Sequence, residues 1–354
     1  MNLSQTAKET SAKHPKIWRF LCILAALTVF FSLLSLYSHI KYHRSSAATV
    51  AEADLRILLL GQDESELTQK LAKLIEEGEK VHEIPDIIRF KSAQSRIDYR
   101  YGSNTLPVVV LEPDEPSDLI IYYLHGGSYL DEPNPFHWRM LDELSQSLSA
   151  TVYTPDYPMI PFHDADFSYP LVLAHYCSVV QQNPDKQIVL MGDSAGGGYA
   201  LGLTAYLQSL ATIPMDGLSL ELQTPRKRLA YLPDYLVLLS PWVDVSMENP
   251  DIDAYLDIDP MLKKDQLMLC GQLWAGGRDV KDPLISPLYA YQPYRSTGEF
   301  TGTIRRSLVK SFPKTLIFAG TREMFYPDIN LFYETLQDIG CDVTLSVGEG
   351  MNHV

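Results

Sequence analysis

The chain has 354 residues, 46% of them hydrophobic, and a formal net charge of -15. A chain of this size and composition buries a large core, so one large domain, or one domain with a lid, is the expected organisation. The acidic balance argues against a nucleic-acid surface, because neutralising phosphates needs many basic residues and the densest basic cluster is Pro225 to Arg228.

The four cysteines have no paired spacing, so the sequence predicts neither a zinc site nor a disulfide framework. We expect them to be core thiols. They are Cys22, Cys177, Cys270 and Cys341.

The first predicted element is an apolar span. Residues Phe20 to Tyr37 carry no charge and are long enough to cross about 30 Å of hydrocarbon as a helix. We therefore expect a polar tail over residues 1–16 and a transmembrane signal anchor over residues 17–40. A cleaved signal peptide is the alternative, because small residues follow the span, although the run is longer than the core of a signal peptide.

The charges around this span predict its orientation. Lysine and arginine are more numerous before it than directly after it, which keeps the N-terminus in the cytoplasm. In such a single-pass membrane protein, the rest of the chain would then lie on the non-cytoplasmic side. If the signal peptide were cleaved, the mature protein would be secreted.

Residues 41–95 are predicted to form a linker and N-terminal helices, because apolar residues from Leu67 to Ile75 recur at helical offsets. Seven short apolar runs then alternate with helix-sized stretches. This alternation predicts a mostly parallel sheet covered by helices on both faces, with sites at the C-terminal ends of the strands. The runs begin at Leu106, Asp118, Ala150, Lys186, Asp234, Lys314 and Asp342.

The fourth run leads into the sequence LMGDSAGGGYA. Gly192, Ser194 and Gly196 form a G-x-S-x-G motif between a predicted strand and a helix-forming stretch. In this setting the motif is typical of a nucleophile elbow, where a tight, strained turn exposes the serine oxygen and small neighbours prevent clashes. The sequence therefore predicts Ser194 as a nucleophile, with Asp193 in a supporting role.

A second motif, in YLHGGSY, also follows a predicted strand. His125, Gly126 and Gly127 leave the backbone unobstructed, so its N–H groups can approach a substrate. We expect the amides of Gly126 and Gly127, with that of Ala195, to form an oxyanion hole. His125 is expected to orient the loop. A plain Gly-Gly turn is the alternative interpretation of this motif. The presence of the nucleophile elbow further along the chain argues against a plain turn.

Four motifs in order, HGGS, GDSAGG, LLSPWVD and DPLISPLYA, resemble the hormone-sensitive-lipase-like branch of the α/β-hydrolases, which includes membrane-anchored arylacetamide and steryl-acetate deacetylases. The resemblance implies an α/β-hydrolase fold over residues 96–354. A helical cap would come partly from residues 53–89 and partly from the stretch after Asp244. The resemblance also implies a carboxylic-ester hydrolase with a Ser–acid–His triad in that chain order, for which no metal or organic cofactor is needed.

The resemblance also assigns the other two triad residues. The acid stands three residues after Gly320, which makes it Glu323. Asp328 is the alternative acid, although a carboxylate there would also cap free N–H groups at a helix start. The base belongs in the loop after the last strand and is therefore His353. Because the family normally continues with a further helix, we expect that helix to be missing and His353 to be poorly held.

The predicted function is hydrolysis of acyl or acetyl esters of hydrophobic alcohols, with a small hydrophobic ester as the ligand. An amidase or formamidase of the same fold is one alternative, because the sequence does not separate the two reactions. A non-catalytic ligand-binding protein on the same scaffold is another, since a fold alone does not fix function. The intact serine, histidine and oxyanion loop favour an enzyme.

Overall fold

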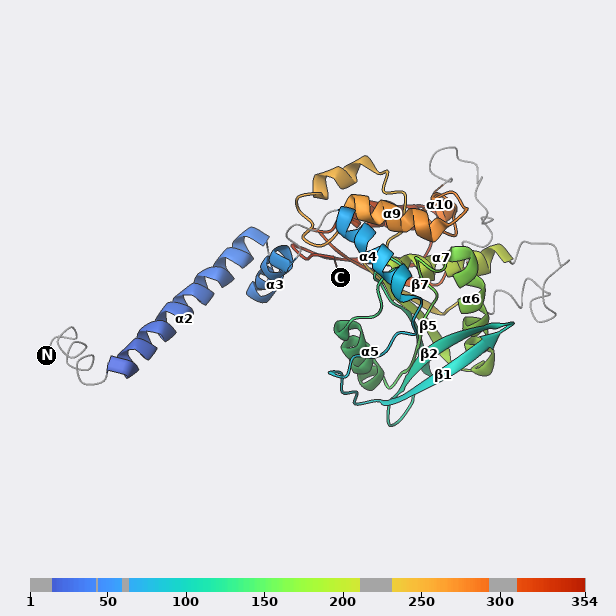
Figure 1. Cartoon of the computed structure of the whole chain (residues 1–354), viewed down its shortest axis with the longest axis horizontal. Helices are drawn as coiled ribbons and strands as arrows, with labels where there is room; N and C mark the ends of the chain where they lie inside the picture. The colour runs from blue at the N-terminus through green and yellow to red at the C-terminus, as the bar shows by residue number, and fades with distance from the viewer. Residues whose placement is uncertain (1–14, 43, 59–63, 211–230, 293–310, 354) are drawn as a thin grey trace.

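A computed structural model of the chain describes residues 15–42, 44–58, 64–210, 231–292 and 311–353. The basic cluster Pro225–Arg228 and nearly all of the polar tail predicted over residues 1–16 lie outside these residues. At the centre of the structure is a twisted β-sheet with helices on both sides (Figure 1).

The described strands form one eight-stranded sheet in the order β1-β2-β4-β3-β5-β6-β7-β8. The pairs β1–β2 and β2–β4 are antiparallel, and the other neighbours are parallel. The strands are β1 Ala93–Tyr101, β2 Asn104–Glu112, β3 Leu119–Leu124, β4 Thr151–Pro155, β5 Gln187–Asp193, β6 Tyr235–Leu239, β7 Lys314–Gly320 and β8 Val343–Gly348. Each of the seven predicted runs contains a strand, so the prediction of a mostly parallel sheet is confirmed.

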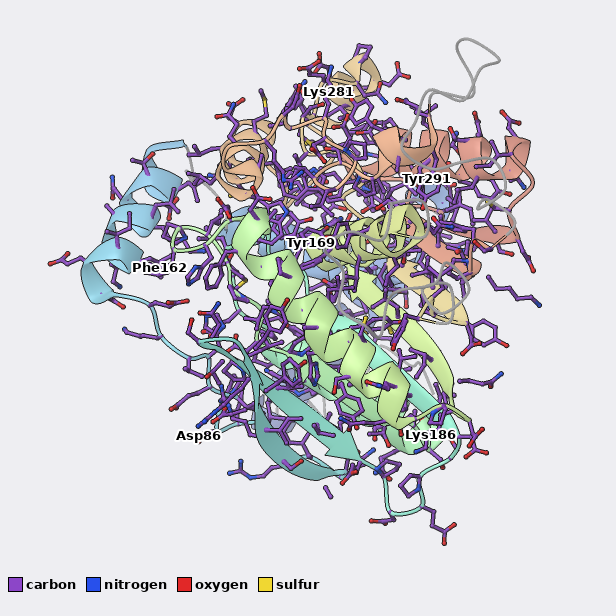
Figure 2. The ribbon with its side chains drawn as sticks, turned by 90° about the vertical axis from the view of Figure 1, so that its right-hand side faces the viewer. Asp86, Phe162, Tyr169, Lys186, Lys281 and Tyr291 are labelled. Atoms are coloured by element: carbon purple, nitrogen blue, oxygen red, sulfur yellow. The ribbon has the colours of Figure 1, made fainter. Side chains whose placement is uncertain are left out.

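Helices connect most of these strands. The described helices are α2 Pro15–Tyr42, α3 Ser46–Leu58, α4 Glu64–Glu77, α5 Pro135–Leu148, α6 Ala165–Gln182, α7 Ser194–Leu210, the 3₁₀ helix η2 Pro250–Tyr255, α9 Lys264–Ala275, α10 Leu288–Tyr291 and α13 Tyr326–Asp338. Figure 2 shows α6 running along one face of the sheet, from near Tyr169 to near Lys186.

The residues of β3 show how the sheet is buried on both faces. Ile120 and Tyr122 belong to a large core that also contains side chains of α6, α7 and α13. Ile121 and Tyr123 belong to a smaller core on the opposite face, together with Trp138 of α5. This alternation is the period of two expected of a strand that is covered on both sides.

Two helices far apart in the sequence, α4 and α9, contact each other and lie side by side in Figure 1. Leu67 of α4 and Leu267 of α9 are both buried in the large core. The amphipathic pattern predicted for the stretch that contains Leu67 is therefore explained by its packing against this second helix.

The N-terminal helix α2 extends away from the sheet in Figure 1. Several of its apolar side chains are exposed, among them Ile23, Phe30 and Leu33. Within the residues that the structure describes, none of the helices combines the length and apolar character required to cross a bilayer. The anchor predicted over residues 17–40 is not supported by this finding.

Candidate active site

Ser194 lies where β5 ends and α7 begins. Its φ of 51° is in the left-handed region, which strains a residue with a side chain. A side chain at Gly192 would collide with the backbone of Gly196, and one at Gly196 would collide with the carbonyl oxygens of Leu124 and His125. The turn therefore has the geometry that the G-x-S-x-G motif predicted.

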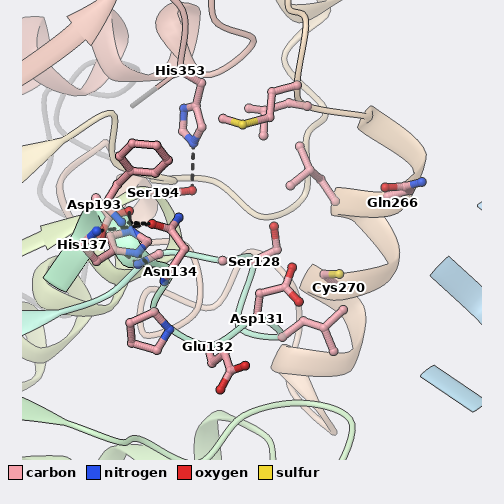
Figure 3. Close-up of a pocket in the computed structure, with 18 of the residues that line it drawn as sticks. Ser128, Asp131, Glu132, Asn134, His137, Asp193, Ser194, Gln266, Cys270 and His353 are labelled. Atoms are coloured by element: carbon pink, nitrogen blue, oxygen red, sulfur yellow. Dashed lines mark hydrogen bonds and ion pairs between the residues drawn. The ribbon is translucent and has the colours of Figure 1, made fainter. Parts of the chain in front are cut away.

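A chain of hydrogen bonds connects three buried side chains. His353 Nε2 lies 2.9 Å from Ser194 Oγ, as the dashed line in Figure 3 marks, and His353 Nδ1 lies 2.6 Å from Glu323 Oε2. The second carboxylate oxygen of Glu323 accepts hydrogen bonds from Ser240 Oγ at 3.0 Å and from the Gly320 amide at 2.7 Å. The sequence had indicated no role for Ser240, which directly follows β6.

His353 is 5% exposed, although we had expected it to be poorly held. Burial disfavours its charged form, but the hydrogen bond and negative charge of Glu323, with smaller contributions from Asp259 and Asp193, raise the pKa of His353 above its ordinary value. Because Glu323 accepts the proton on Nδ1, Nε2 is left as the acceptor that faces Ser194.

Asp328 lies apart from this chain of hydrogen bonds. Its Oδ1 accepts a hydrogen bond from Asn249 Nδ2 at 2.7 Å, and its buried Oδ2 has no hydrogen-bond partner among the described residues. Burial is the main cause that raises the pKa of Asp328 to about 7. The expectation that Asp328 caps a helix is wrong, because in the described structure neither oxygen accepts from the backbone of α13.

The loop after β3 differs in one respect from its prediction. The Gly126 amide donates to Asp193 Oδ1 at 2.8 Å, so the expectation that this amide faces an oxyanion is wrong. The amides of Gly127, Ser128 and Ala195 donate no hydrogen bond within the part of the chain that the structure describes. Gly127 and Ser128, with φ values of 116° and 56°, turn the backbone toward the cavity described below.

His125 is fully buried behind this loop. Its ring stacks on Tyr157 with the centroids 4.4 Å apart, and its Nδ1 lies 2.8 Å from the Gly126 oxygen. Burial lowers the pKa of His125 to about 4, so its ring is neutral at neutral pH. These contacts fit the predicted role of orienting the loop.

Asp193 connects the loop to α5. Besides the Gly126 amide, it accepts hydrogen bonds from Tyr123 Oη and from His137 Nε2, the latter at 3.1 Å. Burial opposes its charge, but His137 and the other donors outweigh burial and lower the pKa of Asp193. His137 was not predicted as a site residue, and its Nδ1 accepts from the Asn134 amide at the start of α5.

A cavity of about 900 Å³ opens above Ser194 and His353. Its walls come from α4, α9 and the loop before α5, and Figure 3 shows Gln266 and Cys270 on one side of it and Asn134 and His137 on another. Cys270 is buried, as expected of a core thiol, and burial raises its pKa to about 12. No group of three or more His, Cys, Asp or Glu side chains among the described residues is arranged to hold a metal ion.

Residues 121–354 match the protein family described as alpha/beta hydrolase fold. The chain belongs to the α/β-hydrolases. The matched residues include most of β3, all of β4 to β8 and the three hydrogen-bonded side chains Ser194, Glu323 and His353. The predicted fold class is thereby confirmed.

Two relatives indicate the chemistry found among proteins similar to this α/β-hydrolase. The acetyl-hydrolase of Streptomyces hygroscopicus is 27% identical over 251 residues, which are 69% of this chain and 70% of that protein. The triacylglycerol lipase of Mycobacterium tuberculosis is 28% identical over 185 residues, which are 52% of this chain and 34% of that protein. The chain thus matches only a part of the lipase.

Solved structures support the same family. A hormone-sensitive lipase from a metagenome library has a TM-score of 0.63 and 24% identity to this α/β-hydrolase, covering 87% of this chain and 90% of its own. EstE7, a homologue of hormone-sensitive lipase from a metagenome library, has a TM-score of 0.60 and 25% identity, covering 86% and 89%. The predicted resemblance to the hormone-sensitive-lipase-like branch is confirmed.

Proposed function

We propose that this α/β-hydrolase is an enzyme that cleaves carboxylic esters with a serine nucleophile. The observation that carries the proposal is the hydrogen-bonded series of Ser194, His353 and Glu323 at the base of a cavity. The names of the relatives, acetyl-hydrolase and triacylglycerol lipase, support an ester as the substrate.

In the proposed reaction, Ser194 Oγ attacks the ester carbonyl carbon while His353 Nε2 takes the hydroxyl proton. His353 then returns this proton to the oxygen of the leaving alcohol as the C–O bond breaks, which leaves an acyl-serine. Water, deprotonated by the same nitrogen, hydrolyses the acyl-serine and restores Ser194. Glu323 keeps the proton of the neutral ring on Nδ1 and stabilises the imidazolium that forms in each step.

The oxyanion that forms on the substrate needs N–H donors. We assign this role to the amides of Gly127, Ser128 and Ala195, because the Gly126 amide is occupied by Asp193. Asp193 and His125 then support the loop without touching the substrate. Ser128 takes the position at which many members of the family have a third glycine.

The proposed substrate is a small ester of a hydrophobic alcohol. The cavity is lined by apolar side chains of α4, of α9 and of the loop before α5, for example Leu67, Leu130 and Leu267. We propose that α4 and α9 form the cap. Residues 41–95 then supply the linker and the N-terminal part of the cap, and residues 96–354 form the catalytic domain, from which α9 contributes the rest of the cap.

A panel of substrates tests this function. We expect the purified chain to hydrolyse p-nitrophenyl acetate and p-nitrophenyl butyrate, with kcat/KM values above that for p-nitroacetanilide. A higher kcat/KM for the anilide would support the amidase instead. Ester binding without turnover would support the ligand-binding protein and contradict the enzyme.

The cellular location stays a prediction from the sequence. We propose that the uncharged run Phe20–Tyr37 keeps the protein in a membrane, with the catalytic domain on the non-cytoplasmic side. The protein is then expected to stay with membranes through an alkaline carbonate wash, and protease added from that side should reach the catalytic domain. A soluble mature chain that begins near Ala48 would establish signal cleavage instead.

A further inference from the structure

A cluster of charged side chains joins α3 to the C-terminal loops, which lie beside each other in Figure 1. Glu52 of α3 accepts hydrogen bonds from Arg44 at 2.5 Å, from Arg56 at 2.9 Å and from Arg322 at 2.8 Å. The side chains of Arg44 and Glu52 are only 2% and 7% exposed. We call these four residues the Glu52 cluster.

Arg322 connects the cluster to the proposed triad acid, because it directly precedes Glu323 in the sequence. Its guanidinium donates to both carboxylate oxygens of Glu52, at 2.8 and 3.2 Å. Its backbone amide donates to the Met351 oxygen at 3.0 Å. The start of the loop that carries the proposed acid, Glu323, is therefore fixed by α3 on one side and by the C-terminal loop on the other.

Arg44 connects the cluster to the proposed base. Its Nη1 donates to the Gly350 oxygen at 2.8 Å and to Asn352 Oδ1 at 3.3 Å, and Asn352 directly precedes His353. The Gly350 amide in turn donates to Thr321 Oγ1 at 2.8 Å, which ties the two loops to each other. The Glu52 cluster thus holds both the residue before Glu323 and the residue before His353.

Glu52 is the only carboxylate in the cluster and faces three guanidinium groups. Burial opposes its charge, but Arg322, Arg44 and Arg56 outweigh burial and lower the pKa of Glu52 to about 2. Glu52 is therefore charged at neutral pH. Without its charge, the buried guanidinium group of Arg44 and the half-buried one of Arg322 would lack this counter-ion, and such uncompensated charges separate or draw in water.

We propose that Glu52 is a positioning residue that holds the loops of Glu323 and His353 in place. This inference rests on the proposed function. A base displaced by about 1 Å can lose about 10²-fold in rate, so small shifts of these loops are enough to lower turnover. Glu52 is not among the described residues that line the cavity, so we expect substrate binding to be independent of it.

The test compares two charge-removing substitutions in the full chain. Glu52→Gln is expected to lower kcat for p-nitrophenyl acetate about tenfold or more and to leave KM unchanged. Asp142→Asn is the matched control: Asp142, like Glu52, is a buried carboxylate, but it lies on α5 and accepts from the amides of Lys91 and Ser92. The control is expected to lower Tm and to keep the wild-type kcat.

A second variant covers the case in which Glu52→Gln does not fold. Arg44→Lys keeps the charge but cannot reach Glu52, Gly350 and Asn352 together, and we expect it to lower kcat with KM unchanged. A folded Glu52→Gln variant with the wild-type kcat would overturn the inference. If Glu52→Gln does not fold, a wild-type kcat in Arg44→Lys would overturn it. An equal loss of kcat in Asp142→Asn would also overturn it. Full ester hydrolysis by Ser194→Ala would instead overturn the proposed function.

Discussion

Ser194→Ala is expected to lower kcat for ester hydrolysis by about 10³-fold or more, because the residual rate then depends on the proposed oxyanion hole and on substrate binding alone. The substitution removes only the hydroxyl group that lies 2.9 Å from His353 Nε2. The fold should remain intact, since alanine keeps the Cβ of serine and the glycines that leave room for the turn are unchanged. Activity against p-nitrophenyl acetate and Tm, measured on the same preparation, test this expectation.

The matched control is Ser168→Ala. Ser168 is fully buried on α6 and its hydroxyl lies 3.0 Å from Tyr199 Oη, in the core beneath the site. Its loss is expected to lower Tm and to leave kcat near the wild-type value. A folded Ser194→Ala variant that hydrolyses esters at the wild-type rate would show that another group is the nucleophile.

Glu323→Gln is the substitution with the second largest expected effect, a loss of about 10³-fold or more in kcat. Glu323 Oε1 faces two donors, Ser240 Oγ and the Gly320 amide, so the oxygen of the new amide is expected to stay there. Its NH₂ group would then face His353 Nδ1 and force the proton of the ring onto Nε2. In that tautomer His353 cannot accept the proton of Ser194.

Asp328→Asn distinguishes the two candidate acids. Asp328 forms no hydrogen bond or ion pair with His353 in the described structure, so this variant is expected to keep its kcat. It is not expected to lower helix stability through a lost cap, because neither oxygen of Asp328 accepts a hydrogen bond from the backbone of α13 in the described structure. An inactive Asp328→Asn together with an active Glu323→Gln would reverse the assignment.

Local patterns in the sequence predicted most of the sheet and the turn at Ser194. Strands buried on both faces appear as apolar runs, and the elbow needs small residues at fixed positions. β1 was missed because its sequence, AQSRIDYRY, is polar and charged, and all but one of its residues are exposed at the edge of the sheet. An edge strand of this kind is stabilised by its partner strand, which its own pattern does not reveal.

Contacts between distant side chains account for what the sequence could not predict. The HGG motif indicated an oxyanion loop. Which amides are free to bind an oxyanion, however, depends on Asp193, whose carboxylate accepts the hydrogen bond of the Gly126 amide. Arg44 and Gly350 are 306 positions apart, and no local periodicity connects them. Glu323 was chosen over Asp328 by resemblance, and the structure adds the physical reason, which is its contact with His353.

The position of β8 has a consequence for how the enzyme loses activity. β8 is the last strand in the sheet order, and its residues are exposed or half-buried, with Val343 and Leu345 packed against the large core. Edge elements of this kind open locally at a lower free-energy cost than the whole domain. Because the proposed base His353 follows β8, each such opening is expected to withdraw it while the core stays folded. We therefore expect the fraction of active molecules to follow this local equilibrium more closely than the free energy of global unfolding.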